Sequence, residues 1–263
     1  VDPQVTPGNH MYSIAGTILG NTSTYDSCME DVPAASTDLS LSSLADTVTL
    51  QWNHSGPGDE VVIARDGTVI ATLSSAETTY TDTGLAAGDY DYCLTMTIGD
   101  GTSPTVCGLI HVLANPSDLS CVSAAGFVNL SWTNNDAYDT LVIERDGALL
   151  AILSGTDTSY TDGTAAVGLR SYTLRGETTT SISGNDSCTV DHFLTAPSGL
   201  SCSVTAGEAD LSWTNGDTYE SIVVSRDGTL LEILPGDTTS YHDATVVFGA
   251  RSYSLVATGG SIE

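Results

Sequence analysis

The chain contains no lysine, so arginine is its only strongly basic residue. Six arginines stand against 33 acidic residues, and the formal net charge is −27. A surface of this charge repels nucleic acid and anionic membranes, so we expect no nucleic-acid partner. The absence of lysine also excludes the lysine–asparagine isopeptide bonds that cross-link some surface proteins.

Long apolar runs and helical patterns are missing as well. No stretch approaches the roughly 18 apolar residues of a membrane-spanning helix, so we expect no membrane insertion. Nowhere do apolar residues recur at helical spacing over three turns. Aromatic residues are few, at 6%, but an apolar fraction of 40% argues against disorder. No signal peptide is recognisable and the chain starts at Val1, so we expect a processed or excised chain.

What the sequence does have is an internal repeat with a period of 80 to 81 residues. Three features share this period: Trp52, Trp132 and Trp213, the Arg-Asp-Gly triplets that begin at Arg65, Arg145 and Arg226, and the tyrosines Tyr80, Tyr160 and Tyr241. A Gly-x-x-x-Tyr pair occurs four times, as Gly8/Tyr12, Gly88/Tyr92, Gly168/Tyr172 and Gly249/Tyr253. Four copies of this pair on three tryptophans indicate that the first repeat is incomplete.

Each repeat has the pattern of β-strands. In FVNLSW, the apolar residues Val128, Leu130 and Trp132 alternate with polar ones, which is the period of a half-buried strand. In LVIERDGALLAIL, the pair Asp146-Gly147 stands between two apolar runs and predicts a tight hairpin, because both residues tolerate positive φ. About seven short strands in each repeat predict a sandwich of two sheets.

The order of these features resembles the fibronectin type III family. The shared elements are Trp on the second strand, a Tyr-Thr-Asp segment, and Gly-x-x-x-Tyr before a final hairpin. More narrowly, "LSWTN…Y…RDG…L…TSYTD…G…SY" is similar to modules of large secreted bacterial proteins. The resemblance covers the whole chain and implies an all-β fold of tandem sandwiches, arranged as an extended rod. It also implies that the tyrosine of Gly-x-x-x-Tyr bonds through its hydroxyl to the backbone.

The repeat phase predicts four segments. Residues 1–31 carry the last two strands of a preceding sandwich, and residues 32–115 and 116–196 are complete repeats. Residues 197–263 form a third repeat that lacks its last strand. Short linkers with a proline at each junction predict that successive repeats hold a fixed relation.

Six cysteines in a chain that we expect to be exported predict disulfides. Their strand positions in the implied sandwich pair Cys121 with Cys188 and Cys93 with Cys107. Two cysteines are then left over. Cys28 lies on a last strand that has no first strand, and Cys202 lies on a first strand that has no last strand.

Two explanations fit these complementary cysteines. Either the chain is part of a longer array, and both cysteines pair outside it, or chains join head to tail by donating a strand. The penultimate strand occurs at both ends, in residues 11–18 and 251–257, so a donor would carry a redundant strand. This redundancy favours the longer array.

No catalytic or metal-binding motif is recognisable. The five histidines form no metal-spaced pair, and no nucleophile elbow, P-loop or dinucleotide fingerprint occurs, so we expect no enzyme. Oxygen-rich loops recur in two repeats and leave structural Ca²⁺ as an alternative to plain solvation. Their residues are Asn134, Asn135, Asp136 and Asp139 in one repeat and Asn215, Asp217 and Glu220 in the next.

Sugar attachment is a further expectation. Asn-x-Ser/Thr sequons occur at Asn21, Asn53, Asn129 and Asn185. Asn129 is predicted to point outward from its strand, opposite in direction to Trp132, and is therefore accessible.

The sequence favours an extracellular or cell-surface scaffold, either a semi-rigid repeat array or a fibre subunit with head-to-tail continuity. The main alternative is an adhesin or a carbohydrate-binding array, whose sites would lie in loops. Tyr138 and Tyr219 are the equivalent loop aromatics that such a site would use, although the first repeat has Gly58 there. A third alternative is a spacer within a larger secreted enzyme.

Overall fold

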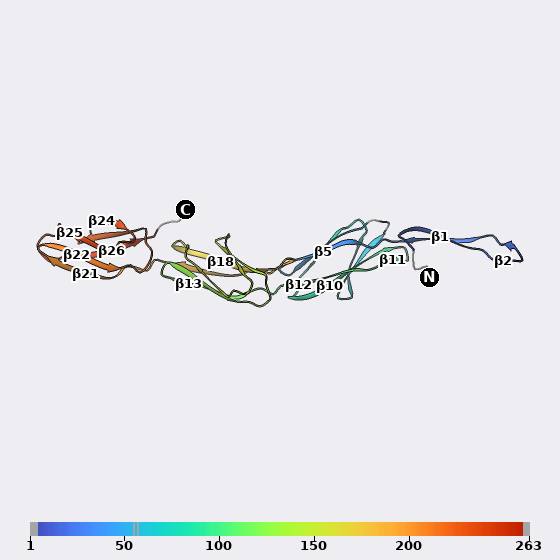
Figure 1. Cartoon of the computed structure of the whole chain (residues 1–263), viewed down its shortest axis with the longest axis horizontal. Helices are drawn as coiled ribbons and strands as arrows, with labels where there is room; N and C mark the ends of the chain where they lie inside the picture. Colours follow the sequence, from blue (N-terminus) through green and yellow to red (C-terminus); the bar gives the residue numbers. More distant parts are fainter. Residues whose placement is uncertain (1–4, 55, 57, 260–263) are drawn as a thin grey trace. The chain divides into compact units, whose positions relative to one another are not determined.

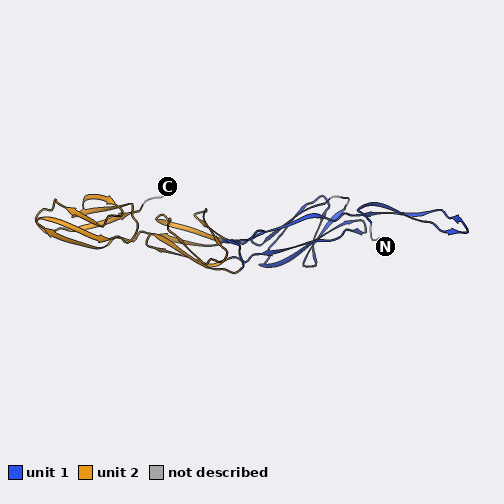
Figure 2. Ribbon diagram, in the orientation of Figure 1, with its two compact units in different colours: residues 1–115, 136–140, 175–184 blue, residues 116–135, 141–174, 185–263 orange. Residues whose placement is uncertain are grey.

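The computed structural model describes residues 5–54, 56 and 58–259, and within these residues every regular element is a β-strand. No helix capable of crossing a membrane occurs in this part of the chain. The chain divides into two compact units, which Figure 2 shows in different colours. The first unit contains residues 1–115, 136–140 and 175–184, and the second contains residues 116–135, 141–174 and 185–263.

The N-terminal segment is a long two-stranded hairpin (Figure 1). Each arm of the hairpin has two strand segments. The first arm contains β1 (Gly8–Ile14) and β2 (Thr17–Ile18), and the second contains β3 (Asn21–Thr22) and β4 (Asp26–Val32). β1 pairs with β4 and β2 with β3, and the chain turns at Leu19 and Gly20, which both have positive φ. Ile14 is 76% exposed. The hairpin therefore presents apolar side chains to solvent.

The first complete repeat is a sandwich of a three-stranded and a four-stranded sheet. The first sheet contains β5 (Thr37–Leu44), β6 (Thr47–Asn53) and β9 (Thr79–Thr83), and the second contains β8 (Thr68–Ser74), β7 (Glu60–Arg65), β10 (Gly88–Ile98) and β12 (Val106–Val112). The short strand β11 (Gly101–Thr102) pairs with the end of β10. Apart from the short strand β11, this is the three-plus-four topology of a fibronectin type III sandwich, as the sequence predicted.

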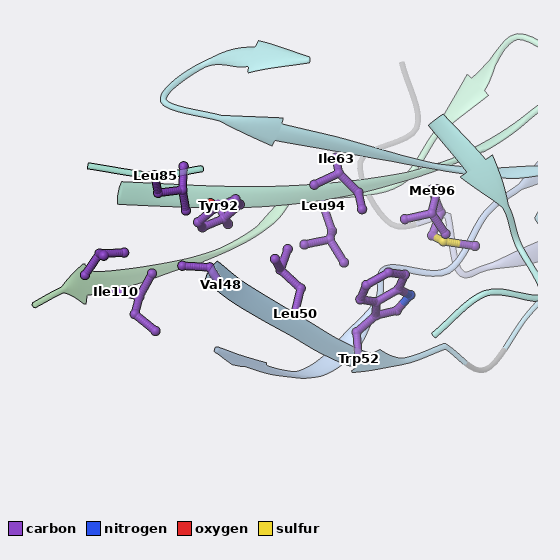
Figure 3. Packing of buried hydrophobic residues seen from close by; sticks show 11 residues of the cluster. Val48, Leu50, Trp52, Ile63, Leu85, Tyr92, Leu94, Met96 and Ile110 are labelled. Atoms are coloured by element: carbon purple, nitrogen blue, oxygen red, sulfur yellow. The ribbon is translucent and has the colours of Figure 1, made fainter. Parts of the chain in front are cut away.

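The core of this repeat lies between the two sheets (Figure 3). Every second residue of β6 points inward, namely Val48, Leu50 and Trp52. On the facing sheet, β10 contributes Tyr92, Leu94 and Met96 in the same alternation, and β7 contributes Ile63. This period of two is the pattern that the sequence showed for each strand.

The second repeat has the same strand order. Its strands are β13 (Ser117–Ala124), β14 (Phe127–Thr133) and β17 (Ser159–Asp162) in one sheet, and β16 (Ala148–Ser154), β15 (Thr140–Arg145), β18 (Gly168–Glu177) and β20 (Asp186–His192) in the other, with β19 (Ser181–Ile182) between β18 and β20 in the chain.

The third repeat differs at one edge. Its sheets are β21 (Ser198–Thr205), β22 (Glu208–Thr214) and β25 (Ser240–Asp243), and β24 (Thr229–Pro235), β23 (Ser221–Arg226) and β26 (Tyr253–Thr258). Within the described residues, β26 pairs with β23 and has no strand on its other side.

The Asp-Gly hairpin turns are confirmed in all three repeats. Asp66 and Gly67 have φ values of 50° and 76°, and Asp146 and Gly147 have values of 52° and 80°. Positive φ at both central positions is the geometry that matches the twist of the flanking strands.

Two disulfides are present. Cys93 and Cys107 lie directly opposite each other on β10 and β12, and Cys121 on β13 is bonded to Cys188 on β20. Cys28 and Cys202 are free and exposed.

Candidate functional sites

A buried ion-pair cluster of Arg, Asp and Tyr recurs in every repeat. In the first repeat, Arg65 Nη1 donates to Asp82 Oδ2 at 2.6 Å, and the Tyr92 hydroxyl donates to the same oxygen at 2.7 Å. The second and third repeats contain the same cluster as Arg145, Asp162 and Tyr172, and as Arg226, Asp243 and Tyr253. The cluster ties the turn-bearing strand, the fifth strand and the sixth strand of each sandwich together.

The electrostatics of the cluster favour an ionised aspartate in the second and third repeats and a protonated tyrosine in all three. Burial alone would raise the pKa of Asp243, but hydrogen bonds from Thr245, Tyr253 and Arg226 outweigh it and lower this pKa to about 2. Burial and the hydrogen bond to the aspartate raise the pKa of Tyr92 and Tyr172. Each tyrosine is therefore a hydrogen-bond donor at neutral pH.

This geometry corrects one prediction. The hydroxyls of Tyr92, Tyr172 and Tyr253 bond to an aspartate side chain and not to the backbone. The physical reason is that an ionised carboxylate is a stronger acceptor than a neutral carbonyl. The sequence contained the signal, because an aspartate follows each Arg-Asp-Gly arginine after 17 positions.

The aspartate of each Arg-Asp-Gly triplet also has a structural contact. Asp146 Oδ1 accepts a hydrogen bond from the Ser171 amide at 2.9 Å, and Asp146 Oδ2 accepts one from Arg170 at 2.9 Å. Asp227 has the same two contacts, with Ser252 and Arg251. In the triplet, the arginine therefore forms an ion pair, the aspartate side chain bonds to the neighbouring strand, and the Asp-Gly pair forms the turn.

The linker between the first and second repeats is held by a two-residue clamp, which we call the linker latch. Asp136 Oδ2 accepts a hydrogen bond from the Ala114 amide at 2.9 Å, and the Tyr138 hydroxyl donates to the Ala114 carbonyl at 2.8 Å. These residues all belong to the first compact unit. Both backbone polar groups of one linker residue are thus bound by one loop.

The strand β19 adds further contacts to the same linker. Ser181 Oγ donates to the carbonyl of His111 at 2.6 Å, and the Gly184 amide donates to Asn115 Oδ1 at 2.8 Å. β19 also pairs in parallel with the end of β5, with Ser181 opposite Ser43.

The linker latch recurs at the next linker, within the second compact unit. Asp217 Oδ2 accepts a hydrogen bond from the Thr195 amide at 3.1 Å, and the Tyr219 hydroxyl donates to the Thr195 carbonyl at 2.5 Å. The shared sequence signal is Asp-x-Tyr, in the same loop of successive repeats.

The linker that precedes the first complete repeat has no such latch, because glycines occupy the two equivalent positions. Gly56 stands where the aspartate would be, and Gly58 where the tyrosine would be. A Cβ atom at Gly56 would lie 2.8 Å from the Cβ of Ala34, so close packing takes the place of hydrogen bonds there.

The first latch carries a histidine between two carboxylates. His111 Nε2 lies 2.9 Å from Asp136 Oδ2, and Nδ1 lies 2.6 Å from Asp89 Oδ1. The hydrogen bonds with Asp136 and then Asp89 raise the pKa of His111 above its ordinary value of 6.5. The stabilisation that these two carboxylates give through His111 is therefore complete below pH 6.5. It is lost as the pH rises through the higher pKa that His111 has in the folded state.

We expect an NMR titration of the His111 ring protons to give a midpoint above 6.5, and Asp136→Asn to lower it, because a neutral amide no longer favours the imidazolium. Asp139→Asn, an exposed change in the same loop, is the matched control and leaves the midpoint unchanged. A midpoint at or below 6.5 in the unchanged chain would contradict this electrostatic reading.

Several loop residues that the sequence left open for calcium or glycan binding have side-chain partners within the chain. Tyr138 and Tyr219 are only 7% and 6% exposed, so they are parts of the latch and not open aromatic surfaces. Asn134 Oδ1 accepts a hydrogen bond from the Trp132 indole at 3.0 Å, and Asn215 does the same for Trp213. Within the described residues, one group of three metal-ligand side chains is close together, and two of its members are the disulfide-bonded Cys93 and Cys107.

The sequon asparagines Asn21, Asn53, Asn129 and Asn185 are all exposed. Sugar attachment at these four positions stays a prediction.

Comparison with known protein families finds no matching family. No curated protein matches the chain. Among solved structures, the chain is similar to a two-domain fibronectin type III segment of chicken tenascin, with 17% identity over 59% of this chain and 98% of that one, at a TM-score of 0.32. It is also similar to fibronectin(III)-like modules of Clostridium thermocellum CbhA, with 18% identity over 61% of this chain and 90% of that one, at a TM-score of 0.34.

A third similar structure is the central fibronectin-III array of RIM-binding protein, with 15% identity over 86% of this chain and 91% of that one, at a TM-score of 0.28. The assignment of the repeats as fibronectin type III-like rests on their strand order.

Proposed function

We propose that this chain is a non-catalytic, extracellular scaffold, an array of sandwiches whose linkers hold successive repeats in a semi-rigid, head-to-tail order. The observation that carries the proposal is the linker latch. It occurs at two successive linkers with the same residue types and the same backbone targets, Ala114 and Thr195.

The latch restricts the linker because it binds the amide and the carbonyl of one residue at once. Rotating that residue breaks both hydrogen bonds, and each is worth about 1 kcal/mol, or more where the acceptor is a carboxylate. Without this clamp, the linker after the first repeat would be held by the contacts of β19 alone. Fixed linkers suit a protein that transmits position or force along its length.

Other features support an exterior location and a structural role. Two disulfides persist best in oxidising compartments. The burial of Tyr138 and Tyr219 removes the exposed aromatics that favoured a carbohydrate-binding array. All six arginines are in ion pairs within the chain: Arg65, Arg145, Arg170, Arg175, Arg226 and Arg251.

The test is a measurement of how independently neighbouring repeats reorient. Residual dipolar couplings on the Cys28→Ser/Cys202→Ser chain are expected to fit one common alignment tensor for the first and second repeats. The double variant Asp136→Ala/Tyr138→Phe is expected to fit a common tensor less well than the unchanged chain, because both latch hydrogen bonds are lost and only the β19 contacts remain.

The control is Asp139→Ala, which changes an exposed carboxylate in the same loop and leaves the common tensor intact. Independent tensors in the unchanged chain would contradict a scaffold with fixed linkers. Selective binding in a glycan-array screen would support the rival class of a carbohydrate-binding array.

A further inference from the structure

The third repeat has an open apolar groove of about 600 Å³ beside β26. Residues that line it include Cys202, Val204, Ala209, Phe248, Arg251 and Tyr253. Val204 is 68% exposed and Phe248 is fully exposed. Apolar side chains so open to water stabilise the molecule only when another segment covers them.

The complete repeats show what fills the equivalent place. In the second repeat, β20 pairs with β18 and contacts β13, and the Cys121–Cys188 disulfide joins β13 to β20. β18 begins at Gly168, whereas β26 begins only at Tyr253, four residues after the equivalent Gly249. Within residues 197–259 no last strand covers the groove, and β26 starts four residues later than β18 does relative to the Gly-x-x-x-Tyr glycine.

Strand β4 repeats the pairing of β20, the strand that occupies the equivalent place in the second repeat. It pairs with β1 in the register that β20 has with β18: Tyr12 lies opposite Cys28 as Tyr172 lies opposite Cys188. Six of the seven residues of β4 are exposed in the hairpin. The strand is thus preformed, correctly registered and nearly uncovered.

We propose that the groove of the third repeat binds β4 of a second copy of this chain, and that Cys28 of one copy and Cys202 of the other form a disulfide. The proposal rests on the proposed scaffold function and extends it, since it names the partner of the groove on the third repeat. β4 runs antiparallel to β26 and continues the sheet.

Transferring the register of β20 onto β4 places three pairs of side chains in contact. Cys28 meets Cys202, because Cys188 meets Cys121 in the second repeat. Glu30 lies opposite Arg251, in the position that Val190 has opposite Arg170. Arg251 already pairs with Asp227, so in the complex its guanidinium would be shared between Asp227 and Glu30 of the partner copy.

The third pair is apolar in the proposed complex, whereas the equivalent pair in the second repeat is polar. In the second repeat, Ser123 Oγ is hydrogen-bonded to His192 Nδ1 at 2.9 Å. The equivalent residues in the proposed complex are Val204 in the groove and Val32 on β4. Two valines suit each other, whereas either one would leave the original polar partner unsatisfied.

A backbone contact completes the match. Asp186 Oδ2 accepts a hydrogen bond from the Leu119 amide at 2.8 Å, and Asp186 Oδ1 accepts one from the Ser187 amide. Asp26 already accepts the second of these bonds, from the Ser27 amide at 3.0 Å. Its other oxygen is therefore oriented to accept from the Leu200 amide of the partner copy.

β4 must leave β1 to occupy the groove, because β26 already fills the place that β1 would take. The ladder with β1 is exchanged for a ladder with residues 249–255, so backbone hydrogen bonds are conserved. In exchange, β4 covers the apolar groove and comes into contact with β21, which lines it. An isolated two-stranded hairpin is only marginally stable in water, so β4 is weakly retained.

The covalent step is thiol–disulfide exchange with a small disulfide oxidant such as oxidised glutathione. The Cys28 thiolate attacks the oxidant, forms a mixed disulfide and releases one glutathione thiol. The Cys202 thiolate of the partner copy then attacks the Cys28 sulfur and releases the second glutathione thiol. Two electrons pass to the oxidant, and the two thiol protons end on the two glutathione molecules.

The test uses the 263-residue chain in a glutathione redox buffer. The unchanged chain is expected to form covalent multimers whose peptide map contains a Cys28–Cys202 link. Cys28→Ser and Cys202→Ser each abolish the multimers. An equimolar mixture of the two variants forms a covalent dimer that extends no further, in at least about tenfold excess over homodimers, because docking raises the effective thiol concentration.

Charge reversal tests the register apart from the thiols. In the same mixture, Glu30→Arg on the chain that keeps Cys28 slows formation of the mixed dimer by about fivefold, and Arg251→Glu on the other chain restores it. A monomer with both thiols reduced would overturn the proposal. So would a Cys28–Cys202 bond within one chain, or homodimers as abundant as the mixed dimer.

Such a failure would leave the scaffold proposal standing, because the alignment measurement uses a chain without either free cysteine.

Discussion

Replacing Cys121 and Cys188 with alanine lowers the free energy of unfolding of the second repeat by about 4 kcal/mol. The bond joins residues that are 67 positions apart, so it removes a large loop entropy from the unfolded chain. Cys93 and Cys107 are only 14 positions apart on paired strands, and replacing them lowers the stability of the first repeat by about 3 kcal/mol. We expect the loss of the Cys121–Cys188 bond to cost more than the loss of the Cys93–Cys107 bond.

The measurement is urea-dependent hydrogen exchange followed by mass spectrometry, because peptides from each repeat report its stability separately. Both variants are made in the Cys28→Ser/Cys202→Ser background to prevent thiol exchange. The third repeat, which has neither disulfide, is the internal control. An equal or larger loss for Cys93 and Cys107 would show that loop entropy does not govern these bonds.

Asp162→Asn is expected to destabilise the second repeat by about 3 kcal/mol, near the lower end for breaking a buried ion pair. The Asp162 side chain is only 1% exposed and accepts hydrogen bonds from Arg145, Tyr172 and Thr164. A neutral amide leaves the guanidinium without its counter-charge. Arg145 stays 25% exposed, so water relieves part of this loss.

The pH dependence of this effect has a definite sign. Burial would raise the pKa of Asp162, but hydrogen bonds from Thr164, Tyr172 and Arg145 outweigh it and lower the pKa below its ordinary value of 3.8. The stabilisation is therefore complete above pH 3.8 and is lost as the pH falls through the lower pKa of the folded state. For Asp243 that window runs from 3.8 to about 2.

Urea-dependent hydrogen exchange at pH 7 and at pH 3 separates the charge from the shape of the side chain, with each rate corrected for its intrinsic pH dependence. Asp191→Asn, an exposed change on β20, is the matched control and is expected to have little effect at either pH. If Asp162→Asn destabilised the repeat equally at both, the ion pair would not be the cause.

Most of the fold was predictable because its signals are local. Alternation along β6 and β14 marks the buried face of each strand, and Asp66-Gly67 marks a turn that needs positive φ at two adjacent residues. Repetition multiplied these signals, since the same pattern recurs in each of the three repeats. The pairing of Cys121 with Cys188 followed from the strand order that the resemblance implied.

The site residues were harder to interpret, because the same residue type serves several purposes. Tyr138 fits a glycan-binding loop by position and spacing, and only its contact with the Ala114 carbonyl identifies it as part of a latch. Asp136 fits a calcium loop equally well, until the structure shows the Ala114 amide against its carboxylate. The partner of a polar side chain depends on segments that are distant in sequence.

The sequence by itself determined the repeat period, the strands and the turns, because each depends on residues a few positions apart or on self-similarity. The tertiary structure decided the rest. It showed that Tyr92 bonds to Asp82, that linkers are clamped through their backbone, and that β4 repeats the register of β20. These contacts depend on which groups meet across the sandwich and the linker, and on the desolvation that makes an ionised carboxylate the preferred partner there.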